Sequence, residues 1–90
     1  MIKQLNLGFL CLFLGILSSC SNTDESLRLT SNAKKMIESS KFDSATTYLD
    51  QAVLLDSTNS EAYYLLGKVK ARSKDYNLAS WYLYKAEKAG

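Results

Sequence analysis

The sequence predicts an all-α fold, built from two helix–turn–helix repeats that pack as antiparallel helix pairs in a short α-solenoid. Residues 26–59 and 60–90 carry one pattern at an offset of 34 residues, which places Leu49 on Leu83. Within each copy, the apolar residues recur with the period of a helix. A repeat of this length cannot bury its apolar face alone, so we expect it to pack against a neighbour.

Composition narrows the range of functions. The chain has 90 residues, a net charge of +2, no histidine and no proline. This length allows one small domain, and the charge does not indicate a nucleic-acid partner. The sequence also contains no glycine-rich phosphate loop and no metal-ligand spacing. It therefore predicts no enzyme and no cofactor or metal site.

Residues 1–19 are expected to be a signal peptide. Lys3 precedes the run from Leu5 to Leu17, which is apolar except for Asn6 and two glycines. As a helix this run spans about 20 Å, less than the roughly 30 Å hydrocarbon core of a membrane. These features are typical of a secretory signal. A short membrane anchor is the alternative.

The motif Leu17-Ser18-Ser19-Cys20 resembles a bacterial lipobox. The resemblance implies that the Cys20 thiol receives a diacylglyceryl group, that the chain is cleaved before Cys20, and that the new amino terminus is acylated with a chain such as palmitate. Each buried methylene contributes about 0.8 kcal/mol, so two or three chains anchor a protein permanently. Ser21 after the cysteine resembles the pattern that sorts lipoproteins to the outer membrane.

Residues 20–25 are expected to form the lipidated cysteine and a tether, because they are polar and lack periodicity. Asp24 and Glu25 loosely resemble a surface-export signal, while a solvated linker is the simpler interpretation. A catalytic thiol at Cys20 is not favoured, because the chain has no histidine to activate it.

Four apolar stripes then predict four helices. Asp43 and Asp75 are expected at the starts of the second and fourth helices, where carboxylates accept hydrogen bonds from free amides. Short connectors predict antiparallel neighbours. In chain order, the stripes are Leu29, Ala33, Met36 and Ile37; Ala45, Tyr48, Leu49, Ala52 and Val53; Ala62, Tyr63, Leu65, Leu66 and Val69; and Tyr76, Ala79, Leu83 and Ala86.

The second copy resembles the tetratricopeptide repeat in its aromatic Tyr63, its Leu66-Gly67 pair and its Asp75-Tyr76 turn. The first copy has Asn32 and Ser57 where that family has leucine and proline. The resemblance covers residues 26–90. It implies that small residues stand where the helices of a pair cross at an axial separation of about 8–10 Å. These residues are Ala33, Ala45, Gly67 and Ala79.

The resemblance implies binding rather than chemistry, because the first helices of such repeats line a concave peptide groove. By position, the groove candidates are Thr30, Lys34, Tyr64, Lys68 and Arg72. Lys34 and Lys68 share one repeat position, so we expect a mildly basic groove that favours an acidic peptide. The alternative is a solvated lysine face.

The aromatic residues Trp81, Tyr82 and Tyr84 on the last helix indicate a contact surface for a partner or a homo-oligomer. Alternatively, they fill the core. The leading interpretation is a lipid-anchored interaction module or scaffold in the bacterial cell envelope, which recruits another protein or peptide. The alternatives are a self-associating structural lipoprotein, or the amino-terminal part of a longer repeat protein.

Overall fold

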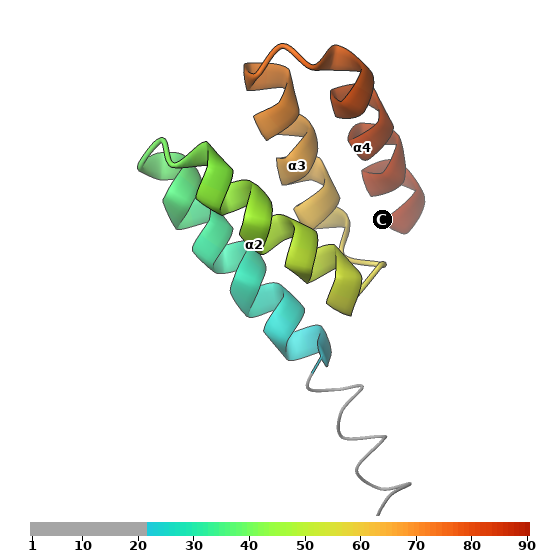
Figure 1. Ribbon diagram of the computed structural model, residues 1–90. Helices are drawn as coiled ribbons and strands as arrows, with labels where there is room; N and C mark the ends of the chain where they lie inside the picture. Colours follow the sequence, from blue (N-terminus) through green and yellow to red (C-terminus); the bar gives the residue numbers. More distant parts are fainter. Residues whose placement is uncertain (1–21) are drawn as a thin grey trace, which may run out of the picture.

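The computed structural model describes residues 22–90, which form four helices and contain no strand (Figure 1). The helices are residues 22–38, α2 (Phe42–Leu55), α3 (Ser60–Arg72) and α4 (Tyr76–Ala89). Successive helices run antiparallel, and α3 packs against both α2 and α4. The prediction of an all-α fold of helical hairpins is confirmed for this part of the chain.

The predicted signal peptide at residues 1–19 and the lipidation site Cys20 lie outside the described residues. Within residues 22–90, no helix combines the length and the apolar character needed to cross a membrane.

The two helical hairpins close with the same turn. Ser40 and Lys74, which are 34 residues apart, have φ angles of 61° and 65°. In the first turn, the Lys41 amide donates to the Met36 carbonyl at 2.8 Å, and in the second the Asp75 amide donates to the Lys70 carbonyl at 2.9 Å. This six-residue closure with a left-handed residue is the Schellman motif. The sequence period is therefore also a period of backbone structure.

The helix starts differ from one another. Asp75 caps α4 as predicted, because its Oδ1 accepts from the Leu78 amide at 3.3 Å. Asp43 lies at the start of α2 as predicted, but it is not the N-cap of that helix. Lys41 is the N-cap of α2 and makes no side-chain cap bond, while Asp43 lies inside the first turn. There its negative charge interacts favourably with the positive end of the helix dipole, although the side chain does not cap an amide.

The first helix begins earlier than expected, because residues 22–25 are helical rather than an irregular tether. Asp24 and Glu25 lie near the helix start, where negative charge is favourable. Glu25 also accepts two hydrogen bonds from the Arg28 guanidinium. This i, i+3 ion pair is a local stabilisation that a search for apolar periodicity does not detect.

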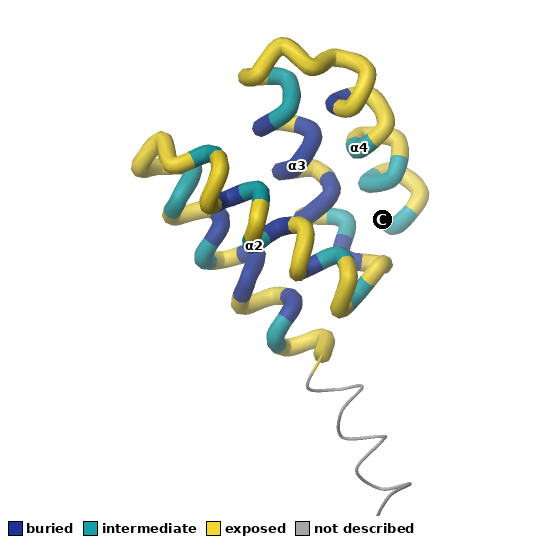
Figure 2. The backbone as a smooth tube through the Cα atoms, viewed as in Figure 1, coloured by how far each residue is buried: buried dark blue, intermediate teal, exposed yellow. Residues whose placement is uncertain are grey.

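The core lies between helix 22–38, α2 and α3, along the inner faces shown in dark blue in Figure 2. Leu49 and Leu66 are its largest fully buried apolar side chains. Met36, Ile37, Tyr48, Val53 and Tyr82 pack around the edge of this core.

The four predicted helix-crossing residues Ala33, Ala45, Gly67 and Ala79 are all buried. A Cβ atom placed on Gly67 would lie 2.8 Å from Leu83 Cδ2 and 3.3 Å from the Ala79 carbonyl oxygen. Such a contact is shorter than carbon atoms adopt, so the absence of a side chain at Gly67 allows α3 and α4 to approach closely.

Candidate protein-interaction surface

A buried polar network joins the two hairpins. The Asn59 amide nitrogen donates to Ser26 Oγ and to Thr30 Oγ1, each at 2.9 Å, while Asn59 Oδ1 accepts from the Ala62 amide at 3.0 Å. Ser26 Oγ in turn donates to the Ala52 carbonyl at 2.7 Å. Every buried polar side-chain atom in the described residues has a partner. The network fixes the register of α3 against the first hairpin.

Thr30 is therefore not a groove residue. Its side chain is 1% exposed and donates to the Ser26 carbonyl at 2.9 Å. The prediction placed Thr30 in the groove by its position in the first helix of the repeat, and Tyr64 is its equivalent in the second copy. However, α3 covers Thr30, whereas Tyr64 is half exposed.

The other four groove candidates lie on exposed positions of helix 22–38 and α3. Lys34 pairs with Glu61 of α3. The Lys68 ammonium lies 5.5 Å from the centre of the Tyr64 ring, and the Arg72 guanidinium lies 4.8 Å from the Phe42 ring. These contacts hold the cations against the protein surface. Glu61 reduces the positive charge that we expected from Lys34.

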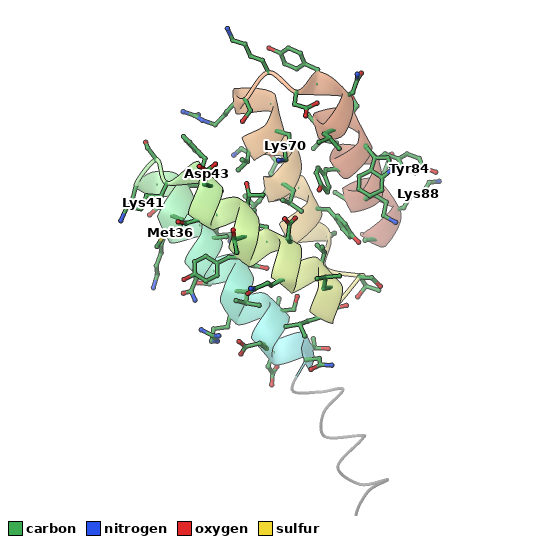
Figure 3. All side chains as sticks on the ribbon, in the orientation of Figure 1. Met36, Lys41, Asp43, Lys70, Tyr84 and Lys88 are labelled. Atoms are coloured by element: carbon green, nitrogen blue, oxygen red, sulfur yellow. The ribbon has the colours of Figure 1, made fainter. Side chains whose placement is uncertain are left out.

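The aromatic residues of α4 divide between the surface and the core edge. Trp81 and Tyr84 are 51% and 55% exposed, so they do not fill the core. Tyr82 is half-buried, packs against the core and contacts the Trp81 ring edge to face, with centroids 5.1 Å apart. Figure 3 shows Tyr84 and Lys88 on the side of α4 that faces away from α3.

The cations of α4 lie over its aromatic rings. The Lys85 ammonium is 5.6 Å from the Trp81 ring and 5.7 Å from the Tyr63 ring of α3. The Lys88 ammonium is 5.5 Å from the Tyr84 ring. Exposed tyrosine and tryptophan side chains are enriched in protein–protein contacts, and the two lysines are held over these rings by cation–π attraction.

Asp50 is an exposed residue of α2 whose charge interacts with Lys70 and with Tyr82. Burial raises the pKa of the Asp50 carboxyl above its usual 3.8, and the nearby Lys70 ammonium opposes that shift. Burial is also the main cause that raises the pKa of the Tyr82 hydroxyl, and the Asp50 charge adds to it. These shifts follow from packing and do not by themselves indicate catalysis.

Two shallow pockets, each of about 270 Å³, lie between helix 22–38 and α2. None of the predicted site residues lines either pocket. Among residues 22–90, no group of three histidine, cysteine, aspartate or glutamate side chains is placed to hold a metal ion. The pocket-lining residues are Met36, Ser44, Thr47 and Tyr48 in one, and Glu25, Leu29, Gln51, Leu54 and Leu55 in the other.

Sequence reasoning missed two exposed residues of α4. Tyr76 is 63% exposed and Leu83 is 43% exposed, although both were assigned to an apolar stripe. Their equivalents in the first repeat, Phe42 and Leu49, are half-buried and fully buried. Comparison of the two copies could have found them, since α3 follows α2 and no helix of residues 22–90 follows α4.

Comparison of the chain with protein-family models, with curated proteins and with solved structures finds no match. The fold and the chemistry of the described surfaces therefore carry the assignment of a function.

Proposed function

We propose that this chain is a non-catalytic protein-interaction module, made of two tetratricopeptide-like repeats and held at a bacterial envelope membrane by lipid on Cys20. The observation that carries the binding role is the exposed apolar and aromatic surface of α4. Exposed tryptophan and tyrosine side chains are enriched at protein–protein contact sites. The repeated Schellman turns support the repeat assignment.

The envelope location rests on the sequence alone, through the apolar run before Cys20 and its lipobox-like ending. Lipid attachment is tested by growth with an alkyne-labelled palmitate. The wild-type chain is expected to incorporate the label and to remain with the membrane fraction. Cys20→Ser should lose both, while Cys11→Ser should lose neither. Incorporation of the labelled palmitate into the Cys20→Ser chain would contradict lipid attachment at Cys20.

The binding role is tested by photo-crosslinking in cells from Trp81 on α4. Expected is one discrete envelope protein in stoichiometric yield. The matched control places the same crosslinker at Leu54, which is 84% exposed on α2. Labelling by both positions alike would indicate non-specific contact. Recovery of the chain itself alone would favour the self-associating structural lipoprotein.

An acidic segment is the partner chemistry that the exposed α3 face favours. Lys68 and Arg72 supply the positive charge of this face, since Lys34 pairs with Glu61. Rim charges influence association rate more than affinity. Reversal of both charges with no effect on partner association would exclude this preference.

A further inference from the structure

The two repeats have the same sequence register but different neighbours. Leu49 of α2 is 0% exposed, whereas its equivalent Leu83 of α4 is 43% exposed. Leu49 shares its core cluster with Ala62, Leu65 and Leu66 of α3. In the first repeat, α3 covers one face of α2. The equivalent face of α4 is not covered by any helix within residues 22–90. We call the open end the surface formed by this face of α4, with Tyr76 and Leu83, together with the α3 residues Ser60, Tyr64 and Lys68, which are equivalent to Ser26, Thr30 and Lys34.

The opposite end of the stack is closed by polar residues. A shift of 34 residues places Arg28, Ser31, Asn32 and Lys35 at the positions of the α3 residues Ala62, Leu65, Leu66 and Val69. Arg28, Ser31 and Lys35 are exposed and Asn32 is half-buried. Helix 22–38 therefore lacks the apolar face with which α3 packs against the first hairpin. This argues against a second copy of the chain stacking head to tail on the open end.

Three contacts between the first hairpin and α3 specify what the open end can receive. Asn59 binds Ser26 and Thr30, whose equivalents are Ser60 and Tyr64. Glu61 pairs with Lys34, whose equivalent is Lys68. Arg72 lies over Phe42, whose equivalent is Tyr76. A hydroxyl pair, a cation and an aromatic ring thus recur in order along the open end.

We propose that the open end binds an amphipathic helix of a partner polypeptide with the chemistry of α3. This helix has an Asn-like cap facing Ser60 and Tyr64, and an acidic residue in its first turn facing Lys68. Small and aliphatic residues cover Leu83, and a basic residue about three turns further on lies over Tyr76. The proposal rests on the proposed interaction function and specifies the partner segment.

One position of the open end differs in character from its equivalent in the first repeat. Glu87 stands at the position of Val53, so the open end is more polar than the face that α3 covers. A surface with both polar and apolar residues is typical of non-obligate interfaces, which are exposed to water when the partner is not bound. A helix packing that occurs once in a stack can recur at the next repeat, because residues at equivalent positions form equivalent ridges and grooves.

The chain itself supplies the probe, a labelled peptide of residues 56–73. Its binding to the full chain in lipid nanodiscs is measured by fluorescence anisotropy. A peptide of residues 22–39, whose equivalent face is polar, is the matched control. The proposal expects saturable binding of the first peptide and none of the second. Absence of binding by the 56–73 peptide, or equal binding of both, would overturn it.

Exchanging the charges of Lys68 in the chain and Glu61 in the peptide tests where on the protein the peptide binds. Lys68→Glu is expected to weaken binding about fivefold, the scale of an exposed ion pair, and Glu61→Lys in the peptide should restore it. Tyr76→Ser should weaken binding about fivefold through loss of the cation–π contact. Leu78→Ser, on the other side of α4, should change nothing. Both Lys68 and Tyr76 are exposed, so these variants are expected to fold.

Other outcomes contradict the inference in recognisable ways. Sensitivity to Lys34→Glu instead of Lys68→Glu would mean that the peptide replaces the chain's own α3. A doubled mass of the peptide-free chain that Tyr76→Ser abolishes would make a second copy the occupant. A partner that crosslinks in cells to a photoreactive residue at position 81 but not to one at position 76 would overturn the open-end proposal alone. The proposed interaction function would still hold.

Discussion

The Leu83 side chain lies in the space that a side chain on Gly67 would need. A Cβ atom on Gly67 would come within 2.8 Å of Leu83 Cδ2 and 2.9 Å of Leu83 Cγ. The contact sets how closely α3 and α4 pack. It also makes the effect of any substitution at Gly67 depend on the residue at position 83.

Gly67→Ala is expected to destabilise the fold by about 1 kcal/mol, because overpacking of roughly 1–3 kcal/mol outweighs the gain in helix propensity of about 1 kcal/mol. In a Leu83→Ala background the same substitution should cost less, because only the Ala79 carbonyl oxygen, at 3.3 Å, remains close to the new methyl group. Urea unfolding of the four variants measures the coupling. Equal effects of Gly67→Ala in both backgrounds would contradict the steric account.

The N-caps of α3 and α4 should differ in their contribution to stability. Asn59→Ala is expected to lose about 2 kcal/mol, since it removes a cap and also a buried donor to Ser26 and Thr30. Asp75→Ala should lose about 1 kcal/mol, because its cap bond is exposed. Chemical denaturation of both variants gives the difference, and equal losses would mean that the buried network adds nothing.

The left-handed turn residues offer stabilising substitutions. Lys74→Gly and Ser40→Gly are each expected to gain about 0.5–1 kcal/mol, because φ near 60° strains a residue with a Cβ atom. Ser73→Gly is the control, since Ser73 has φ −82° and glycine there only adds freedom to the unfolded chain. Melting temperatures test this, and a gain at Ser73 equal to that at Lys74 would refute it.

Asp50 should make stability depend on pH. Its pKa is raised on folding above the usual 3.8, so folding favours the protonated carboxyl. The native state then binds more protons than the unfolded state, and stability is lost as pH rises through the folded pKa. Asp50→Asn is therefore expected to raise the melting temperature slightly at pH 7, since Asp50 is exposed and solvent screens most of the effect. The gain should shrink as pH falls and vanish below about 3.8, where both states are protonated.

The matched control for Asp50 is Asp43→Asn on the same helix. Asp43 lies in the first turn of α2, where its charge favours the helix, so its loss should cost about 0.5 kcal/mol at pH 7. Opposite signs for the two variants are expected. The same sign for both would show that total charge, rather than burial of Asp50, controls the pH dependence.

Much of the fold could be predicted because it is encoded locally. The four apolar stripes, the cap at Asp75 and the small residues at the crossings all depend on spacing within one or two turns of helix. The early start at residues 22–25 escaped notice because an ion pair, rather than apolar periodicity, supports it. The missing side-chain cap of α2 at Lys41 likewise depends on backbone geometry that residue type does not specify.

The candidate surface was predicted less completely, because burial depends on what packs next. Thr30 and Tyr64 share one repeat position, yet α3 covers Thr30 and leaves Tyr64 exposed. By itself, the sequence determined the period of 34, the four helical stripes and the shared register of the two copies. Only the tertiary structure decided which stripe positions are buried and which form the open end. The reason is physical, since periodicity is a property of one helix, whereas the removal of a side chain from water requires a second surface.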